Sequence, residues 1–385
     1  MDCQSSRGES SVLSFELPQR IAVIGAGLGG LTCARELQLR GHDPVVFEAS
    51  GRMGGRCSSR NTRIGWFDDG AQVISGNSRL AAHAMQRTGE LAALHPWTVA
   101  ATPAEDEPKG RDRDKDVDEA DMSRTLKLMG VVGVPSMLAL ANAVGRPLDV
   151  RLNTPIQQAH RRGARWVLHD AAGVIDEDFQ ALVLAIPAPL ALPLAHQSPG
   201  LAAALRAVRY RSRWVLLLGC ERPVGLPGYR EYQGGPIERV AAMHSKPGRM
   251  QNLPQRWFVE ADDRWSAQHE HVDAETAAEL LLDNFRAHAG RPVSPNFLCA
   301  HLWRHARVET PATLDRHADC LWDDAVRLGV CGDSVVASQV HRVHRSGIAL
   351  ASRIGEALMA RRAPRVVPAQ DRNPRHTLEA QVAHG

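Results

Sequence analysis

The sequence predicts an α/β protein built around a discontinuous Rossmann-like domain, with a second α+β lobe inserted into it. Two short apolar runs, residues 20–25 and 44–49, flank a helical segment at 31–41, which is a βαβ arrangement. A glycine-rich turn joins the first run to the helix. The chain has 385 residues, which exceeds one ordinary domain and suits a large α/β unit with an inserted lobe.

Each further element has its own local signal. Apolar residues between 31 and 41 keep to one helical face, and Gly41 stands at the C-terminal cap position. Residues 273–290 predict an amphipathic helix with Asp273 as its cap, and residues 346–362 predict the last helix. Further strands are predicted at four apolar runs: 164–170, 181–187, 213–220 and 327–333.

The turn after the first strand has the spacing of a dinucleotide-binding loop. Gly25 permits a tight turn, Gly27 lets the backbone approach a pyrophosphate, and Gly30 lets the helix pack closely on the strand. The helix N-terminus then offers free N–H groups and partial positive charge to phosphates. Glu48 ends the next strand, where a carboxylate accepts hydrogen bonds from ribose hydroxyls. NAD and FAD both satisfy this pattern.

The turn after Glu48 favours FAD. Its second glycine pair, Gly54 and Gly55, suits a longer buried cofactor, and Arg56 can neutralise pyrophosphate charge. Here the sequence resembles the flavin-containing amine oxidase superfamily, whose hallmark is the glycine-rich loop, an acid and then Gly-Gly-Arg. Residues 326–336, an apolar strand that ends in Gly332 and Asp333, resemble the second flavin signature of that superfamily.

The resemblance implies non-covalently bound FAD. Asp333 is expected to hydrogen-bond the ribityl chain, and residues 69–72 match a loop that lies along the flavin. Carried over residue by residue, the implied cofactor contacts are Gly25, Gly27, Leu28, Gly29, Gly30, Glu48, Ala49, Gly55, Arg56, Gly70, Ala71, Gln72, Ile156, Gly332 and Asp333.

From about residue 20 to 360 the chain is most similar to renalase-like proteins of the bacterial type. The similarity is carried by six stretches: 54–59, 132–144, 184–194, 244–249, 257–273 and 300–306. It implies that the FAD-binding domain comprises 19–85, 148–195 and 322–362. The substrate domain then comprises 86–147 and 196–321. Residues 1–18 and 363–385 are predicted to be flexible tails, and the densely charged stretch 105–121 a solvated loop.

Such proteins oxidise off-pathway isomers of reduced NAD(P). The resemblance therefore implies hydride transfer from a reduced nicotinamide dinucleotide to the flavin, with oxygen as the acceptor. A dihydropyridine is already a good hydride donor, which agrees with the lack of an obvious catalytic acid or base in the sequence. An oxidase or dehydrogenase for an amine or a biosynthetic intermediate is the alternative enzyme.

Substrate contacts are predicted on residues 300–306. Trp303 is expected to wall the pocket, Arg304 to pair with a substrate oxygen, and His301 to lie beside them. The polar loop 244–249 is predicted to be either a substrate contact or a solvated loop.

Residues 338–345 depart from the family pattern. Arg342 stands where a glycine normally lets the last helix approach the flavin. It either supplies positive charge to the flavin or displaces the ring. The second reading opens a third possibility, a protein that keeps the fold with a degenerate flavin site.

Composition limits the partners. The net charge of +3 indicates no attraction to nucleic acid, and no apolar run is long enough to span a membrane. The scattered cysteines contain no Cys-x-x-Cys pair, and the N-terminus has no secretory signal, so a reducing cytoplasm is expected. The pairs His341/His344 and His301/His305 have metal-like spacing but no cysteine partners, so no metal site is predicted. The oligomeric state stays open.

Overall fold

The computed structural model describes residues 18–74, 94–100, 126–250, 254–312 and 318–360. The predicted tails and the charged loop 105–121 lie outside these ranges, except for Pro18. A six-stranded sheet carries the first lobe, in the order β17-β18-β11-β1-β2-β7. Its strands are β1 (Arg20–Ile24), β2 (Asp43–Phe47), β7 (Asp149–Arg151), β11 (Ala181–Leu184), β17 (Leu321–Asp323) and β18 (Leu328–Val330). All neighbours are parallel except β17 and β18.

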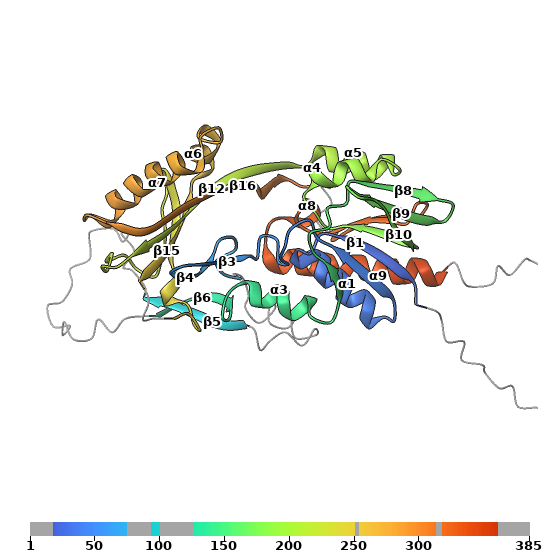
Figure 1. Ribbon diagram of the computed structural model, residues 1–385, viewed down its shortest axis with the longest axis horizontal. Coiled ribbons are helices and arrows are strands. Elements are labelled where there is room, and N and C mark those ends of the chain that lie inside the picture. Colours follow the sequence, from blue (N-terminus) through green and yellow to red (C-terminus); the bar gives the residue numbers. More distant parts are fainter. Residues whose placement is uncertain (1–17, 75–93, 101–125, 251–253, 313–317, 361–385) are drawn as a thin grey trace, which may run out of the picture.

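Both faces of this sheet are covered, as its apolar strands require. The long helices α1 (Leu28–Leu39) and α9 (Val340–Ala360) pack side by side below the sheet in Figure 1. The other face packs on a three-stranded sheet and on three short helical segments. These elements are β8 (Gln158–Arg162), β9 (Arg165–Asp170), β10 (Gly173–Phe179), α4 (Ala188–Ala191), η2 (Leu192–Ala195) and α5 (Pro199–Ala207).

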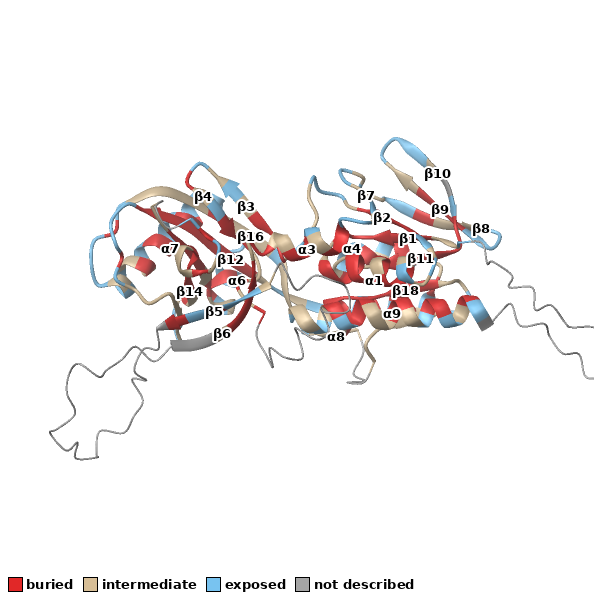
Figure 2. Cartoon of the chain, turned by 90° about the horizontal axis from the view of Figure 1, so that it is seen from below, coloured by how far each residue is buried: buried red, intermediate tan, exposed pale blue. Residues whose placement is uncertain are grey.

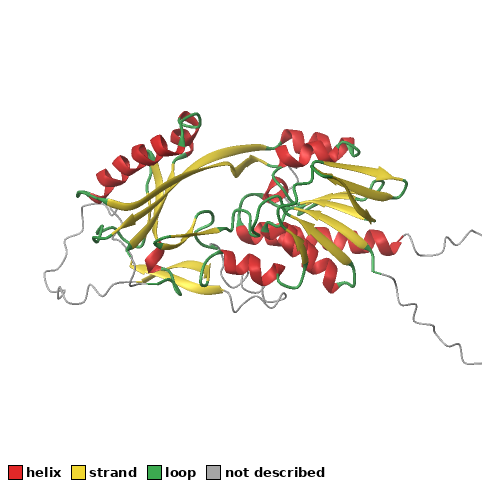
Figure 3. Ribbon diagram, viewed as in Figure 1, coloured by secondary structure: helices red, strands yellow, loops and turns green. Residues whose placement is uncertain are grey.

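The second lobe is a five-stranded antiparallel sheet in the order β13-β14-β15-β12-β16. Its strands are β12 (Arg209–Cys220), β13 (Tyr229–Glu231), β14 (Ile237–Ala242), β15 (Gln255–Ala261) and β16 (Pro295–Thr310). The helices α6 (Asp263–Gln268) and α7 (Ala274–Ala289) cover its outer face, as Figure 3 shows. Asp273 caps α7 as predicted, because its side chain accepts from the Thr276 N–H.

The opposite face of the five-stranded sheet looks toward the first lobe. It packs on two hairpins, made of β3 (Ser59–Thr62) with β4 (Gly65–Asp68) and of β5 (Leu94–Ala100) with β6 (Leu126–Gly133). The remaining elements are α3 (Leu138–Gly145), η3 (Met243–Ser245) and α8 (Asp333–Val336). Strands β12 and β16 run from the first lobe into the second (Figure 1), and their buried residues join the two cores (Figure 2).

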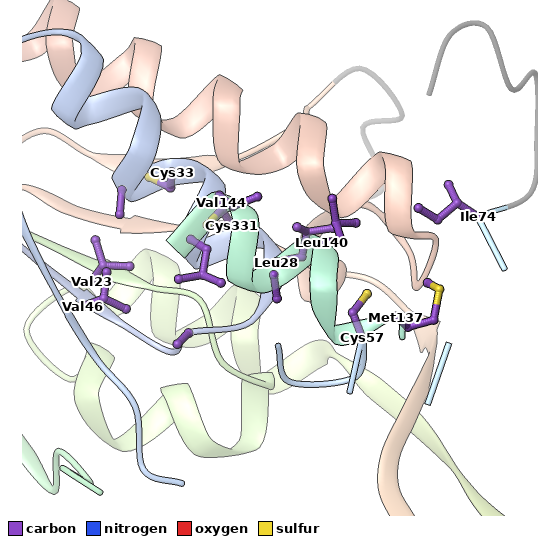
Figure 4. Packing of buried hydrophobic residues seen from close by; sticks show 14 of the residues in the cluster. Val23, Leu28, Cys33, Val46, Cys57, Ile74, Met137, Leu140, Val144 and Cys331 are labelled. Atoms are coloured by element: carbon purple, nitrogen blue, oxygen red, sulfur yellow. The ribbon is translucent and has the colours of Figure 1, made fainter. Parts of the chain in front are cut away.

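Two segments lie in a different lobe from the one predicted. Helix α3 was expected in the substrate lobe, but Leu140 and Val144 pack with Leu28 of α1 in one core (Figure 4). Helix α5 likewise joins the core of the six-stranded sheet. In both cases an apolar helical face finds its partner across the chain, which position in the sequence does not reveal. None of the described helices is long and apolar enough to cross a membrane.

Helix α9 begins six residues earlier than predicted, at Val340. This brings His344 into the helix, where its side chain is fully buried. Neither ring nitrogen has a hydrogen-bond partner among the described residues. Burial lowers the pKa of His344 to about 4, although the Glu36 carboxylate partly opposes this shift. The imidazole is therefore neutral in the folded protein at neutral pH.

This buried histidine predicts acid sensitivity. Between its unfolded pKa of about 6.5 and its folded pKa of about 4, the unfolded chain binds the extra proton, so folding stability falls as the pH falls. We expect protonation linked to His344 to lower the free energy of unfolding by about 3 kcal/mol as the pH falls through that range. The measurement is urea unfolding of the wild type and His344→Leu from pH 7 to pH 4. Parallel pH curves for the two proteins would contradict the prediction.

Candidate flavin and substrate site

The turn between β1 and α1 has the geometry that its glycines predict. Gly25 has a positive φ of 106°, and its N–H donates to the Phe47 carbonyl at 2.8 Å. A Cβ on Gly30 would overlap the Gly25 carbonyl oxygen and lie 2.9 Å from Ala185 Cβ. The helix therefore sits against the strand at a distance that only glycine allows.

Gly27 behaves differently from Gly30. It caps α1 without a side-chain bond and has φ −70° and ψ 167°, an extended conformation that any residue adopts. A Cβ placed on it would meet no other described atom within 4 Å. The first N–H groups of α1 have no intrahelical partners and lie beside this open space. The position can therefore admit a phosphate group close to the backbone. Leu28 and Gly29 follow it as the first residues of α1 and are buried.

Glu48 follows β2, where it was predicted. Its Oε2 accepts the Ala26 N–H at 2.9 Å, and its Oε1 accepts the Ser50 N–H at 2.9 Å. A carboxylate has about four lone-pair sites, so acceptor capacity remains for ribose hydroxyls. Ala49 is exposed beside it, and the half-buried Ile156 packs against the core on the β8–β10 side of the sheet.

Arg56 and Asp333 form a bidentate ion pair, although 277 positions separate them. One arm runs from Nη2 to Oδ1 at 2.7 Å, and Nη1 donates to Asp333 Oδ2 and to the His305 carbonyl. Burial would lower the pKa of Arg56, but the Asp333 carboxylate outweighs burial and the pKa is raised. The two predicted cofactor ligands thus contact each other at the end of β16.

Glycine residues lie close to the Arg56–Asp333 pair. Gly332 has φ 106°, and a Cβ on it would meet no other described atom within 4 Å. Gly55 lies against Gly27, since its Cβ would be 3.3 Å from the Gly27 Cα. A Cβ on Gly29 would lie 3.4 Å from the Gly332 Cα. The three glycine segments predicted from separate parts of the sequence therefore lie side by side.

The loop 69–72 closes this region from the side of β4. The Ala71 N–H donates to the Arg56 carbonyl at 2.8 Å, and a Cβ on Gly70 would overlap that same oxygen. The buried Gln72 side chain donates to the Asp68 and Gly70 carbonyls, at 2.8 and 2.9 Å. The loop is therefore held in one shape against the Gly-Gly-Arg turn.

Strand β16 presents a row of rings toward the first lobe. The Trp303 indole Nε1 donates to the Asp69 carbonyl at 2.8 Å, and the His301 ring lies edge-on to it at 4.8 Å. His305 lies edge-on to Tyr210 at 5.2 Å. Burial is the main cause that lowers the pKa values of His301 and His305, so both rings are neutral at neutral pH.

Arg304 lies on the other face of β16, because side chains alternate along a strand. It is exposed, and its Nη1 lies 3.0 Å from Glu270 Oε1, beyond the end of α6. The structure thus gives no support to the predicted substrate contact by Arg304. His301 and His305 lie against different rings, those of Trp303 and Tyr210. No group of three or more potential ligands lies together among the described residues.

Arg342 is exposed on the first turn of α9, and its Nη1 lies 3.5 Å from the Val336 carbonyl. Val343 and Gly347 face α1 instead, since a Cβ on Gly29 would lie 3.1 Å from Val343 Cγ1 and one on Gly347 would overlap the Gly29 carbonyl. Ala337 just before this helix has φ 118°, a region that favours glycine. Backbone strain is therefore present at Ala337, between α8 and α9.

The loop 244–249 is neither a solvated loop nor an open polar surface. Lys246 is fully buried, and its Nζ donates to Asp68 Oδ2 and to Gln72 Oε1, both at 2.9 Å. Arg249 Nη2 donates to the same Asp68 oxygen at 2.6 Å. Sequence reasoning missed this cluster because Lys246 and Arg249 occur among polar residues typical of a surface loop. Only the adjacent Asp68–Asp69 pair in the sequence gave a signal of it.

A second missed cluster surrounds Asp69, whose side chain is fully buried. Its Oδ2 lies 3.3 Å from Arg60 Nε and 3.5 Å from Arg52 Nη2. Ser58 Oγ donates to Oδ1. The two arginines stand on either side of the Gly-Gly-Arg turn, where the sequence singled out Arg56 alone.

A family described as an NAD(P)-binding Rossmann-like domain matches residues 23–88. Among curated proteins, an L-amino acid oxidase from Cerastes cerastes is 45% identical over 51 residues, which is 13% of this chain and 10% of that protein. A 15-cis-phytoene desaturase from Synechococcus elongatus is 38% identical over 58 residues, 15% of this chain and 12% of that protein. These two matches thus span about a tenth of the relatives' own length.

Two solved structures match nearly the whole chain. A putative protoporphyrinogen oxidase from Exiguobacterium has a TM-score of 0.66 at 12% identity, covering 88% of this chain and 98% of its own. Cyclohexylamine oxidase from Brevibacterium oxydans has a TM-score of 0.66 at 13% identity, covering 89% and 100%. At such low identity the likeness is one of fold. The α/β fold of the amine oxidases that the sequence predicted is confirmed.

Proposed function

We propose that this chain is an FAD-dependent oxidoreductase of the renalase-like type, which oxidises isomers of reduced nicotinamide dinucleotides with oxygen as the acceptor. One observation carries the proposal. Three glycine segments, centred on Gly27, Gly55 and Gly332, lie together at the N-terminus of α1, and a Cβ on Gly27 or on Gly332 would meet no other described atom within 4 Å. A strand with a row of aromatic and imidazole rings faces that region from the second lobe.

The residues present fit non-covalent FAD. The N-terminus of α1 and Arg56 would hold the pyrophosphate, Glu48 the adenosine ribose and Asp333 the ribityl hydroxyls. Arg56 and Asp333 pair with each other in this structure, so each would have to share its hydrogen bonds with the cofactor. When bound, FAD would supply the hydride acceptor for the reaction.

The protein's part in the reaction is binding and orientation. Trp303 is fixed by its bond to the Asp69 carbonyl, so its indole can wall one side of a planar substrate ring. The neutral His301 and His305 add no charge on that face. A dihydropyridine releases hydride without losing a proton to the protein, so the absence of an evident general base on β16 is compatible with this substrate.

An amine or amino acid oxidase is the second candidate. It is favoured by the names of the matched proteins, an L-amino acid oxidase and a cyclohexylamine oxidase. Amine oxidation needs the substrate nitrogen unprotonated, so it would show a pH dependence that a dihydropyridine lacks.

The test is the visible spectrum of the purified protein before and after anaerobic addition of reduced NAD isomers. A flavin spectrum that bleaches with these isomers and not with amines is the expected result. A flavin spectrum that bleaches only with amines or amino acids would replace the proposal by the second candidate. A folded, colourless protein that cannot be reconstituted with FAD would show that the strained 337–345 region has lost the site.

A further inference from the structure

We propose that Arg52, Arg60 and His301 form a subsite for a phosphate group of the substrate. The inference deepens the proposed function and rests on it. The two guanidinium groups converge on one buried carboxylate, Asp69 Oδ2, at 3.5 Å for Arg52 and 3.3 Å for Arg60. Asp69 is held in turn by Ser58 Oγ. Two cations thus share one anion, which leaves the cluster with one unbalanced positive charge.

Burial within the cluster is uneven. The Asp69 side chain is fully buried, whereas the side chains of Arg52 and Arg60 remain 42% and 32% exposed. Asp69 can therefore fix the positions of both guanidinium groups while some of their N–H donors stay accessible. Preorganised guanidinium forks with spare donors are well suited to phosphate oxygens, because they offer paired N–H groups and retain their charge.

The cluster lies beside the predicted substrate wall. The Asp69 carbonyl accepts the Trp303 indole N–H, and Arg60 Nη1 donates to Cys299 Sγ at 3.7 Å. Cys299 and His301 lie two residues apart in a regular part of β16, so their side chains are on the same face and His301 lies on the side of Arg60. From His301, β16 continues to His305, whose carbonyl accepts from Arg56. The arginine cluster and the Arg56–Asp333 pair thus contact the same strand at different residues, Cys299 and His305.

The position of Arg52 and Arg60 beside Trp303 suits a substrate whose planar ring lies against Trp303 and whose phosphate lies against the two arginines. The neutral His301 ring can donate one N–H to the same phosphate without adding charge. A reduced nicotinamide nucleotide has both groups. An uncharged dihydropyridine or a simple amine would leave the arginine donors unused.

The experiment measures ligand binding to the flavin-loaded protein, independently of turnover. Nicotinamide mononucleotide and nicotinamide riboside differ by one phosphate, and their dissociation constants can be read from the perturbed flavin spectrum. The mononucleotide is expected to bind at least ten-fold more tightly. Arg52→Gln and Arg60→Gln should each reduce that preference five-fold or more. Arg353→Gln is the control, because it removes an exposed arginine 3.7 Å from Glu356 on α9.

Calorimetry with inorganic pyrophosphate and with malonate gives a second reading that needs no flavin reduction. Binding of pyrophosphate that is lost in Arg52→Gln and Arg60→Gln, but not in Arg353→Gln, supports the subsite even if reduced NAD isomers do not bleach the flavin. Equal binding of the two nicotinamide probes, or binding of malonate alone, overturns the phosphate assignment. Loss of flavin from either variant, with none from the control, would overturn it by placing these arginines on the cofactor.

Discussion

Asp68→Asn is expected to be among the most destabilising single substitutions in the chain, at a cost of about 3–5 kcal/mol. Asp68 is fully buried and faces Lys246 and Arg249, which are also buried. Burial alone would raise the pKa of Asp68, but these two cations outweigh it and lower the pKa to about 2. Removing the carboxylate charge would leave two buried cations without an anion. Urea unfolding followed by tryptophan fluorescence measures the loss, and Trp97, whose ring lies 5.2 Å from Lys246 Nζ, is one of the eight reporters.

The control is Asp149→Asn, which removes the same charge from a half-exposed carboxylate paired with Arg151 at 3.2 Å. It should change stability by less than about 1 kcal/mol, because exposed ion pairs contribute little. Burial lowers the pKa of Lys246 to about 8, so the pair is ionised between about pH 2 and pH 8. If Asp68→Asn costs no more than the control at pH 7, the buried Lys246 and Arg249 do not depend on the Asp68 charge and the prediction is wrong.

Gly27→Ala is expected to leave the apoprotein as stable as the wild type and to weaken FAD binding at least a hundred-fold. The new Cβ would meet no other described atom within 4 Å, and φ is −70°, so alanine fits the fold. The same methyl group would occupy the space that a pyrophosphate needs beside the α1 N-terminus. Thermal unfolding of the apoprotein and fluorescence titration with FAD measure the two effects separately.

Gly30→Ala is the matched comparison and should behave in the opposite way. Its Cβ would overlap the Gly25 carbonyl oxygen, so the helix must move away from the strand before any cofactor binds. This variant should lose stability without FAD. If Gly27→Ala binds FAD as tightly as the wild type, the open space at Gly27 does not hold the pyrophosphate.

Much of the first lobe could be predicted because its signals are local. The strand, glycine turn, helix, strand and acid lie within residues 20–48, and the glycines act on backbone atoms a few residues away. Gly41 and Asp273 likewise mark helix ends through bonds within one turn. The amine oxidase fold and the meeting of the glycine segments followed from such signals and from the family resemblance.

The face of β16 could not be predicted in the same way. Residues 301–305 contain His, Trp and Arg in alternation, and only the packing decides which of them look toward the first lobe. His301, Trp303 and His305 do, and Arg304 pairs with Glu270 on the other side.

The sequence by itself determined the dinucleotide turn, the predicted FAD segments and the α/β class, because those depend on backbone sterics and short-range periodicity. Only the tertiary structure decided which charged side chains are buried and which oppositely charged side chains they contact. Asp68 meets Lys246 178 positions away, Arg56 meets Asp333 277 positions away, and Asp69 gathers Arg52 and Arg60. The energy of a charge depends on its desolvation and on neighbours in space, and a stretch of sequence does not record either of these.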